Sequence, residues 1–142
     1  MVKQISVFIE NKPGRLMEML KAVAKGNIDI KAFSLADTTE FGVARMIVSD
    51  AEAAKQAIND EGVIVRICRL ITIAVTDEPG ALMSALEILK SNDISIEYMY
   101  AFAEKLDGAS VIAIRTGNQE LADEALKKGG IKVLSQADIE KL

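Results

Sequence analysis

Two short loops carry the residue types best suited to hold a small polar ligand. Residues 10–16 read ENKPGRL and residues 76–82 read TDEPGAL, so an Asn or Asp stands two positions before Pro-Gly in each. We predict that a helix starts at each Pro-Gly, with Pro13 in its first turn, where a missing N–H group costs nothing. The first turn of a helix presents free N–H groups with a partial positive charge, which favours a carboxylate there.

The side chains of these loops suit the two ends of an amino acid. Gly14 and Gly80 have no side chain, so a ligand can approach the backbone closely. Asn11 offers both a donor and an acceptor, while an ionised Asp77 offers only acceptors. The alternative is that Asn11 and Asp77 only cap the helices and that Pro-Gly only makes the turn.

The rest of the sequence argues against catalysis. His is absent and Cys68 is the single cysteine, so the commonest general base and a Cys-rich zinc site are both excluded. We find no nucleophile with a base, no paired carboxylates and no metal cluster. We therefore predict that the chain is not an enzyme, with no catalytic residue, no metal site and no cofactor.

Composition and charge exclude further classes. The chain has 142 residues, a formal net charge of −4 and 4% aromatic residues, which is unlike the basic, aromatic surface that binds nucleic acid. Its N-terminus shows no signal region, and no apolar run approaches the length of a membrane span. With a lone cysteine, these features predict a cytoplasmic protein that binds neither nucleic acid nor membrane.

The chain contains an internal repeat. Shifted by 66 residues, positions 5–48 align with positions 71–114, and nine of the 44 pairs are identical. Beyond Thr116 the shift becomes 68, because two residues are added in a turn near Gly117 and Asn118. We therefore predict two equivalent units, at residues 1–68 and 69–142.

Each copy predicts the same string of elements. In the first copy, alternating apolar residues predict strands at 5–9, 28–37 and 42–49 and a closing strand from 63. Apolar residues at helical spacing predict helices after Pro13 and after Asp50. Met17, Met19 and Met83 lie beside the leucine stripes of the first helices, where they are expected to fill core or interface. The order βαββαβ, found twice, predicts an α+β fold of two ferredoxin-like units joined side by side, each an antiparallel sheet with helices on one face. Ser135 is expected to cap a final short helix.

The loop and the strand that follows each first helix resemble those of the ACT domain. In that family a strand ends in [Asn/Asp]-x-Pro-Gly-x-Leu at the head of the first helix, and the sequences NIDI (27–30) and DISI (93–96) match its second strand. The ACT domain is a small-molecule regulatory module attached to amino-acid biosynthetic enzymes, and the repeat is similar to stand-alone tandem ACT proteins. The resemblance implies ligand binding by loop residues of both copies: Asn11, Lys12, Pro13, Gly14, Arg15 and Leu16, and Asp77, Glu78, Pro79, Gly80, Ala81 and Leu82. It also implies contact with the start of a neighbour's second strand, where Asp29 and Ser95 replace a known Asn.

These observations predict a non-catalytic regulatory protein that binds a small ligand, an amino acid, at the two loops. Lys12 and Arg15 favour the first loop for the ligand carboxylate. We expect a homodimer, because alternation places apolar residues on the sheet face away from the helices: Phe8, Ile47, Ala74, Val111 and Ala113. The expected partner is an enzyme or regulator of amino-acid metabolism. The alternative is a dimerisation or docking module for such a partner, with no small-molecule ligand.

Overall fold

The computed structural model describes residues 1–37 and 40–142 and contains two compact units. The first unit comprises Lys3–Cys68, and the second comprises Arg69–Leu142 together with Met1–Val2. Strand β4 (Val65–Val75) passes from the first unit into the second without a break. Each unit is described here by itself.

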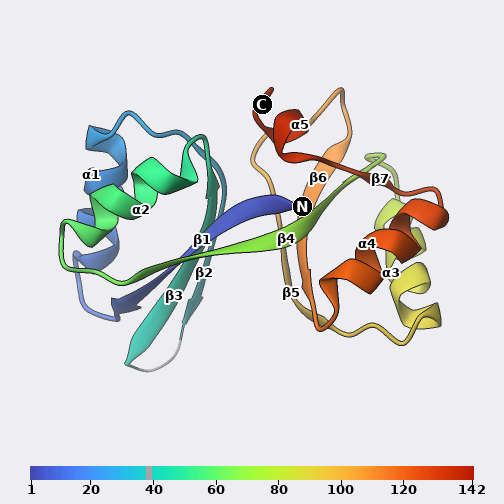
Figure 1. Cartoon of the computed structure of the whole chain (residues 1–142), viewed down its shortest axis with the longest axis horizontal. Helices are drawn as coiled ribbons and strands as arrows, with labels where there is room; N and C mark the ends of the chain where they lie inside the picture. Colours follow the sequence, from blue (N-terminus) through green and yellow to red (C-terminus); the bar gives the residue numbers. More distant parts are fainter. Residues whose placement is uncertain (38–39) are drawn as a thin grey trace. The chain divides into compact units, whose positions relative to one another are not determined.

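The first unit is a four-stranded sheet with two helices. Its elements are β1 (Val2–Glu10), α1 (Arg15–Lys25), β2 (Ile30–Asp37), β3 (Phe41–Val48), α2 (Ala51–Asn59) and the start of β4. The strand order is β2-β3-β1-β4, and β3 is antiparallel to both β1 and β2. Both helices lie on one face of the sheet (Figure 1).

Alternation along the strands explains the core of the first unit. Ile5, Val7 and Ile9 point toward the helices and are buried with Met46 and Ile58. Asp50 caps α2, since its carboxylate accepts a hydrogen bond from the Ala53 N–H at 3.0 Å. The strand predicted at 28–37 begins two residues later than expected, at Ile30.

The second unit repeats this arrangement. After β4 come α3 (Ala81–Ser91), β5 (Ile96–Ala101), β6 (Ser110–Thr116), α4 (Gln119–Lys128), β7 (Lys132–Val133) and α5 (Gln136–Ile139). The order is β5-β6-β4-β7, with antiparallel pairing throughout. The predicted α+β fold, with βαββαβ repeats and helices on one face of an antiparallel sheet, is confirmed.

Several local predictions can be compared with the structure. Ser135 caps α5 in a reciprocal capping box with Asp138, as predicted. Met19 is buried in the core, but Met17 and Met83 are 56% and 60% exposed, so of the predicted core or interface only an interface is left for these two. No helix of residues 1–37 and 40–142 has the length and apolarity needed to cross a membrane.

The apolar residues from which a homodimer was predicted are mostly less exposed than expected. Ile47, Ala74, Val111 and Ala113 are at most 9% exposed within the single chain, whereas Phe8 is 55% exposed. Four of the five residues therefore need no second copy to cover them. The homodimer remains a prediction to which this set of residues gives little support.

Candidate functional site

The loop between β1 and α1 has a glycine at the helix boundary. Helix α1 begins at Arg15, and Gly14 is its N-cap, with φ 87° in the left-handed region. The prediction that Pro13 lies in the first helical turn is wrong, because Pro13 precedes this glycine. Gly80 caps α3 in the same way, with φ 84°. The left-handed conformation is accessible to glycine without the steric cost that other residues incur.

Neither helix has a side-chain cap. The N-caps of α1 and α3 make no side-chain hydrogen bond, so the alternative that Asn11 and Asp77 act as helix caps is wrong. At the start of α1, the Arg15 N–H donates to the Lys12 carbonyl at 3.2 Å and the Glu18 N–H to the Gly14 carbonyl at 3.0 Å. The N–H groups between them find no acceptor in the described chain. They belong to Leu16 and Met17 and give α1 two open donors at its positive end.

The charged residues of the first loop are already paired. The Lys12 ammonium lies 3.0 Å from the Glu10 carboxylate, and the Arg15 guanidinium lies 3.2 Å from the Glu18 carboxylate. The hydrogen bond and positive charge of Lys12 hold the pKa of Glu10 below its ordinary value. The positive charges of Lys12 and Arg15, which were predicted to favour a ligand carboxylate at this loop, are therefore each offset by a neighbouring carboxylate.

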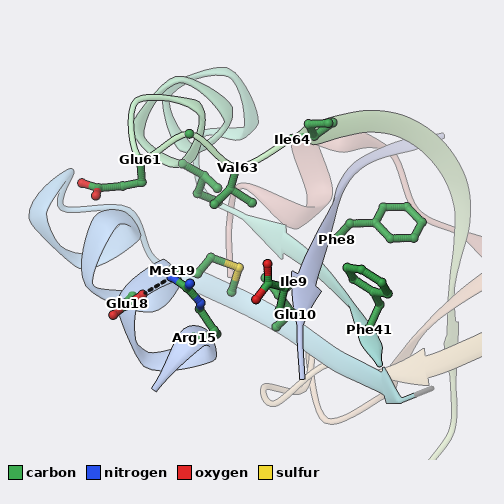
Figure 2. A pocket seen from close by; sticks show the side chains of 12 residues that line it. Phe8, Ile9, Glu10, Arg15, Glu18, Met19, Phe41, Glu61, Val63 and Ile64 are labelled. Atoms are coloured by element: carbon green, nitrogen blue, oxygen red, sulfur yellow. Dashed lines mark hydrogen bonds and ion pairs between the residues drawn. The ribbon is translucent and has the colours of Figure 1, made fainter. Parts of the chain in front are cut away.

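A cleft opens beside this loop in the first unit. It has a volume of about 760 Å³ and is bordered by the end of β1, the first turns of α1, Phe41 of β3, Ile58 of α2 and the segment before β4. Figure 2 shows Arg15, Glu18 and Glu61 on one side of this view and Phe8 and Phe41 on the other. We call it the first-unit cleft. Its lining comprises Phe8, Ile9, Glu10, Arg15, Glu18, Met19, Phe41, Ile58, Glu61, Gly62, Val63 and Ile64.

Most of this lining was not predicted from the sequence. Of the predicted site residues, the structure places only Arg15 in the lining itself. The missed signal is a comparison of the two copies: at the equivalent positions in the second copy, charged residues become uncharged and large apolar residues become small or charged. The pairs include Phe8 with Ala74, Glu10 with Thr76, Arg15 with Ala81, Glu18 with Ser84, Met19 with Ala85, Phe41 with Asp107, Glu61 with Gly129 and Ile64 with Lys132.

The second loop has a different environment. The Asp77 carboxylate accepts a hydrogen bond from the ammonium group of Lys105. This contact, followed in size by the positive charge of Lys105, lowers the pKa of Asp77. At the start of α3, the Met83 N–H donates to the Gly80 carbonyl at 3.0 Å, so a donor that stays open in α1 is used here. Glu78, Pro79 and Gly80 are exposed and Ala81 and Leu82 are partly buried.

Asp29 and Ser95 lie far from the loop of their own unit. Glu10 pairs with Phe41 and Ile30 pairs with Val48. The end of β1 and the start of β2 are therefore seven positions apart along β3, or about 24 Å at roughly 3.4 Å per residue. The corresponding separation along β6 is six positions, or about 20 Å. No single amino acid spans either distance within one unit.

Asp29 has an ion-pair partner close by in the sequence, and Ser95 borders a separate cleft. The Asp29 carboxylate lies 2.7 Å from the ammonium of Lys31, whose hydrogen bond and charge lower the pKa of Asp29. Ser95 borders a shallower cleft of about 300 Å³ between the end of α3 and β5. Within the described part of the chain, no three His, Cys, Asp or Glu side chains are grouped to hold a metal ion.

Comparison with known proteins agrees with this architecture. The model of a family described as an ACT domain pair matches residues 1–142. A Bacteroides thetaiotaomicron protein of known crystal structure is 38% identical, with a TM-score of 0.91 over 99% of this chain and 96% of that one. The regulatory subunit of aspartate kinase from Thermus thermophilus, in a ligand free form, shares the fold at 17% identity, with a TM-score of 0.64 over 89% of this chain and 91% of that one. No curated protein matches the sequence.

Proposed function

The chain belongs to the ACT domain pair family, and we propose that it is a non-catalytic regulatory protein that binds an amino acid at the β1–α1 loop of its first unit. One observation carries this proposal: the first-unit cleft adjoins a helix start that has two open N–H donors. A cleft of this size is within the range of small-molecule sites. The carboxylate of an amino acid can meet the N–H donors of the helix start, and its ammonium group can meet the carboxylates that border the cleft.

The ligand carboxylate is proposed to bind the N–H groups of Leu16 and Met17. Helix starts bind anions because free N–H groups and the helix dipole act together. Gly14 leaves this end of α1 uncovered, since no heavy atom lies within 4 Å of where its Cβ would be. Asn11, Lys12 and Pro13 shape the loop, and Arg15 supplies positive charge at the border of the cleft.

The ligand ammonium is proposed to face the carboxylates of the cleft. Glu10, Glu18 and Glu61 all border it. Glu61 is the carboxylate most available, because its side chain has no hydrogen-bond or ion-pair partner among the described residues. Charge-assisted hydrogen bonds of this kind are stronger than neutral ones.

The second loop is proposed as the weaker site. Residues 77–82 keep the Asp-x-Pro-Gly-x-Leu pattern, but Asp77 is held by Lys105 and Ala81 replaces Arg15. Because of their distance from the loop of their own unit, Asp29 and Ser95 cannot contact a ligand that is bound at that loop. We propose that they border a neighbouring unit's ligand, as the family resemblance implies.

A panel of the twenty amino acids tests the proposal by thermal unfolding. A ligand present at 100 times its Kd adds about 2.7 kcal/mol to stability, so one or more amino acids should raise the unfolding temperature. The change Arg15→Ala with Glu18→Ser installs the residues of the second copy and should reduce this shift. If no amino acid raises the unfolding temperature, the proposed ligand is wrong.

A second candidate function is docking without a ligand. Phe8, Phe41 and Ile64 are 55%, 49% and 71% exposed, which is a large apolar area to leave in water. In this alternative the chain forms a homodimer or binds an enzyme or regulator of amino-acid metabolism through its surfaces. Light scattering of the free protein measures the homodimer directly, and two chain masses are expected in either function.

A further inference from the structure

We infer that the first-unit cleft receives the side chain of the ligand and selects a large apolar amino acid, aromatic or aliphatic. This inference rests on the proposed function and adds the chemical class of the ligand. The evidence for it is the apolar lining of the cleft outside the β1–α1 loop, the exposed side chains at the rim of the cleft, and the arrangement of charges around the cleft.

The inner wall of the cleft is apolar. Ile9, Met19 and Ile58 are 8%, 3% and 0% exposed and belong to the core of the first unit. Val63 packs against the same core and is partly buried. The core thus reaches the cleft directly, and an apolar side chain entering there gains contacts with residues that are already fixed. A polar side chain would lose hydrogen bonds to water without finding partners on this wall.

The outer wall carries exposed aromatic and aliphatic side chains. Phe8 and Phe41 lie on adjacent strands and are about half exposed, and Ile64 precedes β4. The second copy has Ala74, Asp107 and Lys132 at the three positions, so the fold itself does not require apolar residues there. Covering these side chains with an apolar ligand removes them from water, which is favourable at about 25 cal/mol per Å².

The charges of the cleft fit a zwitterion and disfavour a ligand with an acidic side chain. Three carboxylates border the cleft, and its lining contains one cation, Arg15, which is paired with Glu18. An acidic ligand side chain would meet like charge. In Figure 2 Arg15 and Glu18 lie on the side of the view away from Phe8 and Phe41, Glu61 lies farther along that same side, and Glu10 lies between the two sides. A ligand whose charged groups face Arg15, Glu18 and Glu61 and whose apolar group faces Phe8 and Phe41 fits this arrangement.

Calorimetry on the full chain distinguishes this inference from the proposed function. The probes are L-phenylalanine, L-leucine, L-alanine, L-aspartate and L-lysine. Each buried methylene contributes about fourfold in affinity, so phenylalanine or leucine should bind at least tenfold more tightly than alanine, aspartate and lysine. Tighter binding of aspartate or lysine, or equal binding of alanine and leucine, would overturn the inference and leave the proposed function standing. If none of the five binds and no other amino acid shifts the unfolding temperature, both are wrong.

Substitutions at the rim of the first-unit cleft test whether its side chains contribute to the affinity for an apolar amino acid. Phe8→Ala introduces the residue that the second copy has at this position and should lower the affinity for leucine or phenylalanine at least fivefold. Met83→Ala removes an equally exposed side chain from the second unit and should change nothing. Equal affinities of both variants and the parent protein would contradict the inference. If Phe8→Ala instead halves the mass measured by light scattering without ligand, the rim contacts a second copy and the inference is wrong.

Discussion

A matched pair of glycine substitutions tests the geometry of the two loops. Gly14 and Gly80 have nearly the same backbone, with φ 87° and 84°, and no heavy atom lies within 4 Å of a Cβ built at either position. The cost of alanine at both sites is therefore conformational rather than steric. We expect Gly14→Ala and Gly80→Ala to destabilise the protein equally.

The magnitude follows from the left-handed conformation. It costs an L-residue about 1–2 kcal/mol, and the reduced freedom of the unfolded chain offsets about 0.4–1 kcal/mol of this. A net loss of about 1 kcal/mol remains, which lowers the unfolding temperature by about 2–4 °C for a chain of this size. Urea unfolding, with unchanged slopes, measures the same loss at constant temperature.

The two variants should differ in binding. In Gly14→Ala the new methyl group occupies open space through which the ligand would approach the loop, so calorimetry should show at least a tenfold loss of affinity for the ligand. Gly80→Ala should bind normally and serves as the control of equal stability. Loss of binding in Gly80→Ala with normal binding in Gly14→Ala would refute the ranking of the loops. Full stability of either variant would refute the account of its backbone.

Three other changes test packing, capping and charge. Met46→Ala should cost about 2–5 kcal/mol of unfolding free energy, because Met46 is fully buried in the first core, whereas the exposed Met17→Ala should cost less than about 0.5 kcal/mol; urea unfolding compares the two. Asn118→Ala removes the side chain that accepts the N-cap hydrogen bond of α4 and should cost about 1 kcal/mol. Lys12→Met should raise the pKa of Glu10 toward its ordinary value of 4.5. The stabilisation from ionised Glu10 is present above that value and is lost as pH falls through the lowered pKa, so in Lys12→Met this pH-dependent contribution should be absent; an NMR titration of the Glu10 side chain follows its pKa.

Much of the fold was predictable because its signals are local and repeated. The alternation of Ile5, Val7 and Ile9 defines the buried face of β1, and the 66-residue repeat defines the same element in the second copy. Helix starts were also predictable where a side chain caps them, as Asp50 does. The Pro-Gly sequence suggested that Pro13 lies in the first turn of α1. The helix instead begins at Arg15, because the Gly14 that follows Pro13 has a left-handed backbone.

The site was less predictable because it depends on contacts between distant segments. Glu61 and Val63 lie about fifty positions from the loop and border the same cleft only because β4 is the neighbour of β1 in the sheet. The pairing of Lys12 with Glu10 depends on rotamers, which composition does not specify. Met17 lies outside the core because a helix position next to a buried stripe can still face water.

The number of binding sites per chain tests the central claim most directly. Titrating the chain with the amino acid that gives the largest thermal shift should show one ligand bound per chain. That single event should be weaker in the variant that combines Arg15→Ala and Glu18→Ser. Two equivalent ligands per chain would show that the loops do not differ, and the absence of any binding by calorimetry would contradict the account of an amino-acid site in the first unit.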